Sequence, residues 1–433
     1  MNSTTKSVCI FYPTLENLGG IERVIEAHAR IFAQRGIHVT IVTEQPVVKL
    51  RGGLTEYADF FVMSAVKPSY DFTILDSYIK EKKVDAFILH GAHYESAAII
   101  AEHLKNCKLK VILNIHFSFP SPLYLTGDED QLDKHLHVAR QCDAVATVSA
   151  IDAVFWNALG VYAIHVQNPI NVKTKSKQLC SRSQPARRNL LWIGRMMEPK
   201  QPEEAMFILQ EIVKYIPNVK LTMVGGTIAS GKALMQKAKA LGIFNNVCIS
   251  PETSNIQSYY EAADMHLLTS STESFCLVLA EAKARGIPTA MYEIPFLDLV
   301  GDGKGIIAAP YNNREELAKK IVDVLTNEEA WIQLCQEASS SLKSFNDDMV
   351  YESWIPAFDS DTSSSITPQN RSVNMICVEF YKAWTYRVQK DLWKINIWND
   401  FEKLVGNRAA SMMSRLLRTF FRNLRKTKQY LSR

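Results

Sequence analysis

The feature that most constrains the fold is a repeated alternation of short, continuously apolar runs with longer segments of helical periodicity. Val8–Tyr12, Ala86–Leu89 and Leu190–Ile193 are three of these runs, and Lys110–Ile115 is a similar segment whose apolar residues are interrupted only by Asn114 after the opening Lys110. Unbroken apolar runs of this length are typical of strands that are buried on both faces of a parallel sheet. The segments between them carry apolar residues at the spacing of amphipathic helices. The alternation predicts an α/β fold with mostly parallel, doubly wound sheets.

The alternation occurs in two blocks, which predicts two Rossmann-like domains in the 433 residues. We expect residues 1–172 to form the N-terminal domain, a polar and basic stretch at 173–189 to be a linker, and 190–345 to form the second domain. Beyond these, we expect a polar insertion at 346–372, an aromatic-rich helical segment at 373–400 and a basic amphipathic tail at 401–433.

Charge and cysteine usage exclude several classes of protein. The net charge is +4, but segment 401–433 alone contains nine Lys and Arg residues and only one acidic residue, Glu402. The basic character is therefore local and does not indicate a nucleic-acid-binding protein. The eight cysteines include no C-x-x-C pair, which favours reduced thiols in a cytoplasmic protein over a disulfide or zinc framework. No apolar run has the length of a signal peptide or a membrane span.

The most informative stretch is His266–Pro288, which reads as strand, small-polar turn and helix. Glu273 lies before the helix and Glu281 eight residues later, within it. A helix N-terminus favours an anion such as phosphate, and carboxylates beside it accept hydrogen bonds from sugar hydroxyls. Phosphate together with a polyol describes a nucleotide sugar. The alternative is that Glu273 caps the helix and Glu281 is a solvated surface residue.

Two further motifs suit a phosphate ligand. Gly19 and Gly20 follow the first strand and open a helix, where glycine lets backbone N–H groups approach a phosphate closely, although a plain tight turn is the simpler explanation of the pair taken alone. Arg195 and Lys200 lie in a strand-to-helix loop, where a guanidinium fork and a point charge could hold a diphosphate. No GxGxxG dinucleotide fingerprint is present.

Histidines follow two of the predicted strands. His116 comes directly after Lys110–Ile115, and His90 and His93 follow Ala86–Leu89. These positions lie at the carboxyl edge of a parallel sheet, where such folds bind ligands. The loop-rich segment Phe117–His135 could line an acceptor cleft.

Taken in order, Gly19–Gly20, Gly194-Arg195-x4-Lys200 and Glu273-x7-Glu281 resemble the retaining nucleotide-sugar glycosyltransferases of family 4. The turn Asp302-Gly303-x-Gly305 is similar to one that follows the acidic helix in that family. The resemblance covers roughly 5–345 and implies the GT-B fold: two Rossmann-like doubly wound domains facing a central cleft, with a C-terminal helical extension. A C-terminal helix crosses back to the first domain in this fold, and 373–400 is the candidate segment.

The resemblance also implies roles. Glu273 would contact the transferred sugar, Glu281 the donor ribose, and His116 would position the sugar at the reaction centre. The donor-binding positions that the resemblance implies are Gly19, Gly20, Arg195, Lys200, Ser274, Phe275, Cys276 and Glu281.

The chain departs from the family pattern at two places. The family often has Glu-Gly-Phe-Gly where this chain has Glu273-Ser274-Phe275-Cys276, and it usually has Gly where Gln201 follows Lys200. The missing glycines put close backbone approach to the phosphates in doubt, but neither change removes a charged group.

From these residues we expect a glycosyltransferase that moves a sugar from a nucleotide-diphosphate sugar to a glycan or lipid-linked acceptor with retention, in cell-surface polysaccharide synthesis. No D-x-D metal motif and no cofactor are predicted. The basic amphipathic pattern of 408–433 suits an anionic membrane surface on the inner face of the plasma membrane, or alternatively a protein partner. A non-catalytic GT-B subunit, a sugar-nucleotide epimerase and a glycogen-synthase-like polymerase are the alternative functions.

Overall fold

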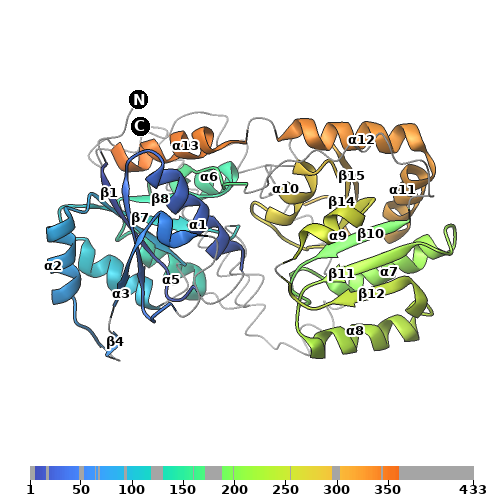
Figure 1. Ribbon diagram of the computed structural model, residues 1–433, viewed down its shortest axis with the longest axis horizontal. Helices are drawn as coiled ribbons and strands as arrows, with labels where there is room; N and C mark the ends of the chain where they lie inside the picture. The colour runs from blue at the N-terminus through green and yellow to red at the C-terminus, as the bar shows by residue number, and fades with distance from the viewer. Residues whose placement is uncertain are drawn as a thin grey trace. The chain divides into compact units, whose positions relative to one another are not determined.

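The computed structural model describes residues 5–15, 19–47, 53–63, 65–66, 69–91, 95–118, 130–158, 160–170, 188–197, 199–253, 255–294, 303–342 and 345–359. The chain forms two compact units, each an α/β body (Figure 1). Unit 1 comprises 1–17, 28–167 and 351–433, and unit 2 comprises 18–27 and 168–350. Helix α1 (Gly20–Ala33) therefore begins in unit 2 and ends in unit 1.

Unit 1 contains a seven-stranded parallel sheet in the order β3-β2-β1-β6-β7-β8-β9. Its strands are β1 (Ser7–Phe11), β2 (His38–Thr43), β3 (Asp59–Val62), β6 (Ala86–His90), β7 (Lys110–Ile115), β8 (Ala144–Thr147) and β9 (Ala163–His165). A separate antiparallel pair joins β4 (Ala65–Val66) and β5 (Ser69–Tyr70). The strand order reverses between β1 and β6, which makes the loops after these two strands the expected ligand-binding loops.

The helices of unit 1 cover both faces of its sheet. They are the second half of α1, α2 (Thr73–Lys82), α3 (Glu95–Leu104), α5 (Asp130–Ala139), α6 (Ala150–Ala158) and α13 (Asp347–Asp359), with a 3₁₀ turn η1 (Leu54–Glu56). Apolar residues of α2, α3, α5 and α6 share one core cluster with inward-facing strand residues such as Phe11, Phe87 and Leu113. Helices α1 and α13 pack on each other through Phe32 and Trp354.

Unit 2 contains a six-stranded parallel sheet in the order β12-β11-β10-β13-β14-β15. Its strands are β10 (Asn189–Ile193), β11 (Lys220–Val224), β12 (Val247–Ser250), β13 (Met265–Leu268), β14 (Thr289–Tyr292) and β15 (Ile306–Ala309). Here the order reverses between β10 and β13. The loops after these strands carry the Arg195–Lys200 motif and Glu273, so the predicted donor motifs flank the switch point.

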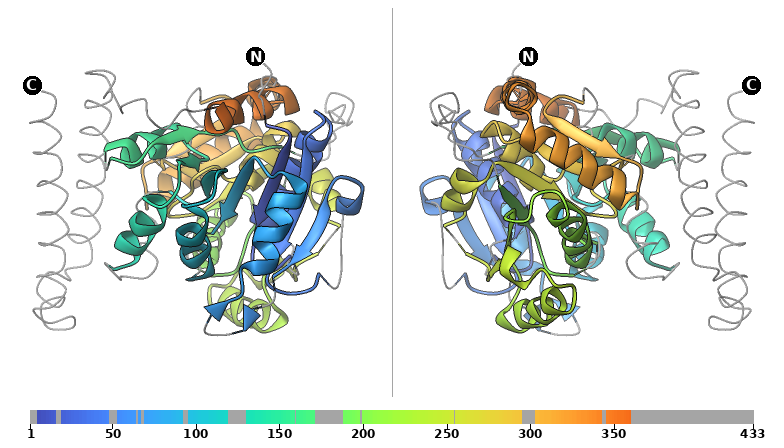
Figure 2. Two further views of the ribbon diagram at one scale, coloured as in Figure 1. Left: turned by 90° about the vertical axis from the view of Figure 1, so that its left-hand side faces the viewer. Right: turned by 90° about the vertical axis from the view of Figure 1, so that its right-hand side faces the viewer.

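Strand residues of unit 2 alternate between two cores. Leu190 and Trp192 face a large cluster with α7 (Pro202–Val213), α8 (Ile228–Ala240), α11 (Arg314–Thr326) and α12 (Glu328–Ser341), whereas Leu191 faces a smaller cluster with α9 (Gln257–Ala262) and α10 (Leu277–Ala284). A second 3₁₀ turn, η3 (Phe244–Asn246), precedes β12. Figure 2 shows each sheet from the side with helices on both of its faces. The predicted α/β fold with two parallel sheets is confirmed.

Two predictions need correction. The segment 346–372, expected to be a polar insertion, begins with helix α13, whose Val350, Trp354 and Phe358 are buried, and the helix belongs to unit 1 from Tyr351 onward. Acidic and polar neighbours hide this apolar stripe in the sequence. Likewise, the predicted loop at 117–135 ends in a helix, because α5 begins at Asp130. The predicted segments 373–400 and 401–433 lie outside the described residues.

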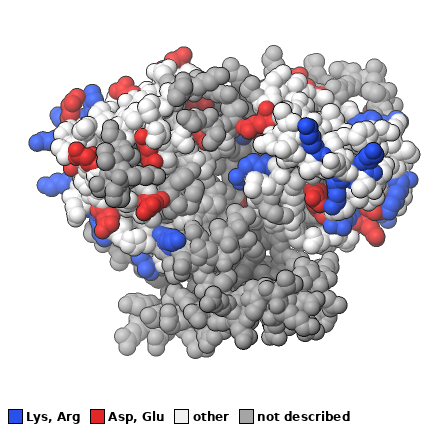
Figure 3. Space-filling view, turned by 90° about the horizontal axis from the view of Figure 1, so that it is seen from below, with Lys and Arg blue, Asp and Glu red and all other residues white. Residues whose placement is uncertain are grey.

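The described surface carries both signs of charge. In the view of Figure 3, Lys and Arg are interspersed with Asp and Glu on both units. Among the described residues, no helix has the length and apolarity needed to cross a membrane.

Candidate functional site

The loop after β10 holds the predicted cations. Gly194 ends the strand, Arg195 is exposed, and the Lys200 side chain turns back beneath the loop with 19% of its surface accessible. A Cβ on Gly194 would lie 3.3 Å from the Lys200 side chain, so glycine leaves room for the lysine there. In the described part of the chain, the guanidinium of Arg195 has no carboxylate bonded to it.

The loop after β13 is tied to this loop by a buried threonine. The Thr269 hydroxyl accepts a hydrogen bond from the indole Nε1 of Trp192 (2.9 Å) and lies 2.9 Å from the carbonyl oxygens of both Lys200 and Gln201, to which it donates. The Ser271 amide also donates to the Pro199 carbonyl at 2.9 Å. These contacts fix the two loops at the switch point relative to each other.

Lys200 and Glu273 form an ion pair across the switch point. The Lys200 Nζ lies 2.5 Å from the Glu273 Oε1, and the Glu273 side chain is only 10% exposed. Burial is the largest single influence on the pKa of Lys200 and lowers it, but the charge and hydrogen bond of Glu273, together with Cys276, leave the pKa raised. The lysine is therefore charged at neutral pH. The same cation adds to burial in lowering the pKa of nearby His266 to about 3.

Helix α10 begins without a side-chain cap. Its N-cap residue is Cys276, with φ of 60° in the left-handed region, and this residue makes no side-chain capping hydrogen bond. Glu273 is therefore not the N-cap residue, and its carboxylate is bonded to Lys200. Ser274, Phe275 and Cys276 are buried, and the Phe275 ring packs against Phe345. Any contact of these three residues with a phosphate would have to come from their backbone.

Glu281 is not a solvated surface residue. Its carboxylate, 12% exposed, pairs with the guanidinium of Arg23 and accepts a hydrogen bond of 2.8 Å from the Tyr260 hydroxyl. Burial and the Glu281 charge raise the pKa of Tyr260, so the phenol stays protonated and donates. Arg285 lies over the Tyr260 ring at 4.3 Å. Glu281 is held in a fixed orientation by groups from α9 and α1.

The predicted glycine motif lies beside α10. A Cβ on Gly20 would lie 3.2 Å from the Leu277 side chain, and one on Gly19 would lie 2.3 Å from the Glu22 carboxylate. Glycine at position 20 therefore leaves room for the first turn of α1 beside the start of α10, and glycine at position 19 leaves room for the Glu22 side chain of α1 itself. Of the turn Asp302-Gly303-x-Gly305, Gly303 and Gly305 have backbone dihedral angles in the left-handed region. Asp302 lies outside the described residues.

His116 lies in unit 1, directly after β7, and is half-buried. Its Nε2 is 2.7 Å from the Nδ1 of His90, the last residue of β6. The two histidines that were predicted to follow neighbouring strands are thus in contact. His93 lies outside the described residues.

Sequence reasoning missed Arg23, Tyr260, Thr269 and the pair Gly225–Gly226. A Cβ on Gly225 would lie 2.0 Å from the Gly194 carbonyl oxygen, so the β11 loop touches the β10 loop. Arg23 had a usable signal, because a cation in the first turn of a helix opposes the helix dipole unless an anion is near. Tyr260 and Thr269 carried none, since their partners lie far away in the sequence.

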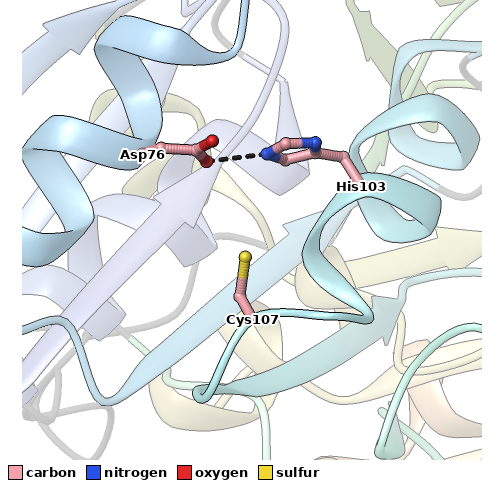
Figure 4. Close-up of side chains that lie close together, drawn as sticks. All are labelled: Asp76, His103 and Cys107. Carbon is pink, nitrogen blue, oxygen red and sulfur yellow. Dashed lines mark hydrogen bonds and ion pairs between the residues drawn. The ribbon is translucent and has the colours of Figure 1, made fainter.

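One further group of metal-binding side chains occurs in the described residues. Asp76 of α2, His103 of α3 and Cys107 have ligand atoms within 4.8 Å of one another (Figure 4). The His103 Nε2 is already bonded to the Asp76 carboxylate at 2.7 Å, and its ring stacks on Phe72. Zinc needs all ligand atoms about 2.0–2.3 Å from one centre. Because the His103 nitrogen already makes a hydrogen bond with Asp76, we interpret the group as a contact between α2 and α3.

Models of two glycosyltransferase domains match the two halves of the chain. Residues 18–172 match the model for "Glycosyltransferase Family 4", and residues 181–340 match that for "Glycosyl transferases group 1". An uncharacterized glycosyltransferase of Haemophilus influenzae is 25% identical over 363 residues, which cover 81% of this chain and 99% of that protein.

Solved structures share the fold. The crystal structure of TarM superposes with a TM-score of 0.67 at 13% identity, over 82% of this chain and 99% of that one. Anabaena HepE in complex with UDP-glucose gives a TM-score of 0.63 at 14% identity, over 80% of this chain and 98% of that one. Both establish the GT-B fold for this chain.

Proposed function

We propose that this glycosyltransferase, which carries a family 4 domain and a group 1 domain, moves a sugar from a nucleotide-diphosphate sugar to a glycan or lipid-linked acceptor with retention of configuration. In this proposal Arg195 and Lys200 neutralise the diphosphate and Glu273 binds hydroxyls of the transferred sugar. Glu281 binds the donor ribose, and His116 positions the sugar.

The observation that carries the proposal is the Lys200–Glu273 ion pair at the switch point of the unit 2 sheet. Ligands of open α/β sheets bind at such points. Lys200 and Glu273 are nearly buried and pair with each other. Together they offer what a nucleotide sugar needs, a positive charge for the phosphate and a hydrogen-bond acceptor for the hydroxyls. Arg195, exposed beside them, supplies a second cation.

The arrangement also suits the charge that develops during transfer. Breaking the bond between sugar and diphosphate places negative charge on the leaving phosphate, which fixed cations and helix N-termini stabilise. Because Arg195 and Lys200 supply this charge, we propose that the reaction needs no metal. The donor phosphate would help to deprotonate the acceptor on the same face, which gives retention.

Donor binding is tested first by thermal unfolding of the full chain with a panel of nucleoside diphosphates and nucleotide sugars. A ligand that binds only the native state raises the midpoint as its concentration exceeds the dissociation constant. We expect a shift with one nucleotide series that disappears in Glu281→Ala and Lys200→Ala. Lys237→Ala, an exposed lysine of the same unit that pairs with Glu203, is the control. The absence of a shift with every donor would contradict the proposal and favour a non-catalytic subunit.

Retention can be tested before the acceptor is known. Slow hydrolysis of an α-linked nucleotide sugar, followed by proton NMR, should first release the α-anomer of the free sugar. Initial release of the β-anomer would contradict retention. The same reaction should keep its rate in EDTA if no metal takes part.

We further propose that the protein works in the cytoplasm on cell-surface polysaccharide, with 408–433 at the inner face of the plasma membrane. The support is the basic amphipathic pattern of that sequence. The full chain should pellet with anionic vesicles and a chain ending at Asn407 should not. Equal pelleting of the two would exclude the tail as the membrane-binding segment.

A further inference from the structure

The hydroxyl of Thr269 makes three hydrogen bonds whose directions are all fixed by the chemistry of its partners. Thr269 follows β13 directly and is fully buried. Its oxygen lies 2.9 Å from the indole Nε1 of Trp192 and 2.9 Å from the carbonyl oxygens of both Lys200 and Gln201. An indole N–H only donates and a carbonyl only accepts. The hydroxyl therefore accepts from Trp192 and shares its own proton between the two carbonyls.

The backbone that Thr269 holds makes an unusual turn. Gln201 has φ of 49° and ψ of 62°, in the left-handed region, directly before α7. Its carbonyl also accepts from the Glu204 amide in the first turn of α7, at 3.1 Å. In the described residues, the Lys200 carbonyl has no such second bond to a backbone amide. Loss of the Thr269 hydroxyl would therefore release the backbone of Lys200 more than the start of the helix.

The side chain of Lys200 passes the same indole. A Cβ placed on Gly194 would lie 3.3 Å from both the Trp192 ring and the Lys200 side chain, so these two groups flank one point of the loop. The Nζ at the end of the side chain lies 2.5 Å from the Glu273 carboxylate. Lys200 is thus restrained at its backbone by Thr269, along its side chain by the space beside Gly194, and at its charge by Glu273.

Under the proposed function, only the last of these restraints changes when a donor binds. The Lys200 charge then turns to the diphosphate and the Glu273 carboxylate to sugar hydroxyls, so their ion pair opens. The bonds of Thr269 involve no atom that binds the donor, and the same is true of the Ser271 amide, which donates to the Pro199 carbonyl at 2.9 Å. These bonds hold the Lys200 backbone in place while its charge exchanges partners.

We propose that Thr269 is a positioning residue, which acts through the Lys200 backbone to hold the Lys200 ammonium where the sugar leaves the diphosphate. The inference rests on the proposed function for the role of Lys200. Because Thr269 is fully buried, it acts through this backbone and not on the donor itself. The leaving phosphate carries more charge in the transition state than in the bound donor. A displaced cation therefore lowers kcat more than it raises KM.

The first test needs no substrate. Thr269→Val keeps the approximate shape of the side chain without its hydroxyl, and Thr269→Ser keeps the hydroxyl. The coupling between Lys200 and Glu273 is obtained in each background from the urea unfolding of Lys200→Ala, Glu273→Gln and their combination. We expect this coupling to fall to about half or less in Thr269→Val and to persist in Thr269→Ser. Unchanged coupling in Thr269→Val would overturn the proposal.

Thr289→Val is the matched control. Thr289 is another fully buried threonine of the same sheet, at the start of β14, and its hydroxyl lies 3.2 Å from the His266 Nδ1. Its loss should lower stability without changing the coupling of Lys200 with Glu273. An equal fall of the coupling in Thr289→Val would mean general loosening of the unit and would also overturn the proposal. If Thr269→Val does not fold, Thr269→Ala removes the hydroxyl with a smaller side chain and is judged by the same outcomes.

Turnover is the second readout, once the donor is identified. Thr269→Val should lower kcat by up to about 100-fold with a smaller change in the KM for donor, and Thr269→Ser should recover most of the loss. In the Lys200→Ala background, Thr269→Val should cost less than about threefold more, because the lysine through which it acts is absent. Losses that multiply would show that Thr269 acts independently of Lys200 and would overturn the proposal.

The two readouts separate the failure of this inference from the failure of the proposed function. A chain that binds no donor would contradict the proposed function, and the coupling of Lys200 with Glu273 would still decide whether Thr269 holds the lysine. A chain that binds and turns over its donor normally with Thr269→Val would contradict only the role of Thr269.

Discussion

Replacing Lys200 tests two proposed roles of this side chain, in stabilising the transition state and in compensating the charge of Glu273. The Lys200 Nζ lies 2.5 Å from the Glu273 carboxylate. We propose that it turns to the diphosphate when the nucleotide sugar binds. Losing one preorganised charge at a developing anion costs about 2–4 kcal/mol of transition-state stabilisation. At about 1.4 kcal/mol per tenfold, Lys200→Ala should lower kcat/KM by roughly 30- to 1000-fold.

The same substitution should destabilise the protein without ligand, for a different reason. Removing one partner of a buried pair costs about 3–5 kcal/mol because the remaining charge has lost its compensation. Lys200 is 19% and Glu273 10% exposed, so water relieves part of this cost and we expect about 2–3 kcal/mol. Glu273→Gln in the Lys200→Ala background removes the unpaired charge. Stability should then return to within about 1 kcal/mol of the wild type, and donor turnover should not recover.

The assay combines urea unfolding, followed by tryptophan fluorescence, with turnover at donor concentrations far below KM. Lys237→Ala is the matched control, because its pair with Glu203 is exposed and should contribute less than about 1 kcal/mol. Normal kcat/KM in Lys200→Ala would refute the phosphate assignment. Recovery of turnover in the double variant would show that the lysine acts only by compensating Glu273.

Other predictions concern pH, orientation and metal. His28, His90 and His266 have lowered pKa values in the folded protein, so unfolding takes up protons below about pH 6.5. Stability should fall on acidification by about 1.4 kcal/mol per pH unit for each histidine, which urea midpoints at pH 7 and pH 5 will measure. Tyr260→Phe removes the hydrogen bond that orients Glu281, and titration calorimetry should show donor affinity weakened by up to about tenfold. Full turnover in EDTA should persist, and loss restored by a divalent metal would contradict metal independence.

The fold was predictable because its signals are local. The buried strands β1, β6 and β10 contain continuous apolar runs, and the pattern of each is visible within five residues. Helix α13 was missed because it places Val350, Trp354 and Phe358 among acids, so that its composition suggests a polar segment. Its identity as a core helix depends on a partner, Phe32, more than 300 positions earlier.

The sequence predicts charged residues for the candidate site but not their contacts. Lys200, Glu273 and Glu281 were chosen from their positions at strand ends and helix starts and from the family resemblance. Their actual partners in this structure, Arg23 and Tyr260 for Glu281, come from other elements and have no local signature. The same holds for the His90–His116 bond, which needs the pairing of β6 with β7 to bring two strand ends together.

The missing family glycines lead to the last prediction. Gln201 and Cys276 stand where the resembled family has glycine, and both adopt positive φ, 49° and 60°. The backbone therefore keeps the shape that glycine would give and bears a cost of about 1–2 kcal/mol at each position. Cys276→Gly should relieve that cost and lose about 0.5–1 kcal/mol to the greater freedom of the unfolded chain.

The net effect expected for Cys276→Gly is between no change and a gain of about 1 kcal/mol. Cys276→Val should be clearly destabilised, because a β-branched residue tolerates positive φ poorly. Urea unfolding of the two variants measures both effects. Equal losses in both would mean that the buried thiol, not the backbone, sets the stability of this turn. In the expected case, the loop at the start of α10 keeps a glycine-like path for a phosphate although it contains no glycine.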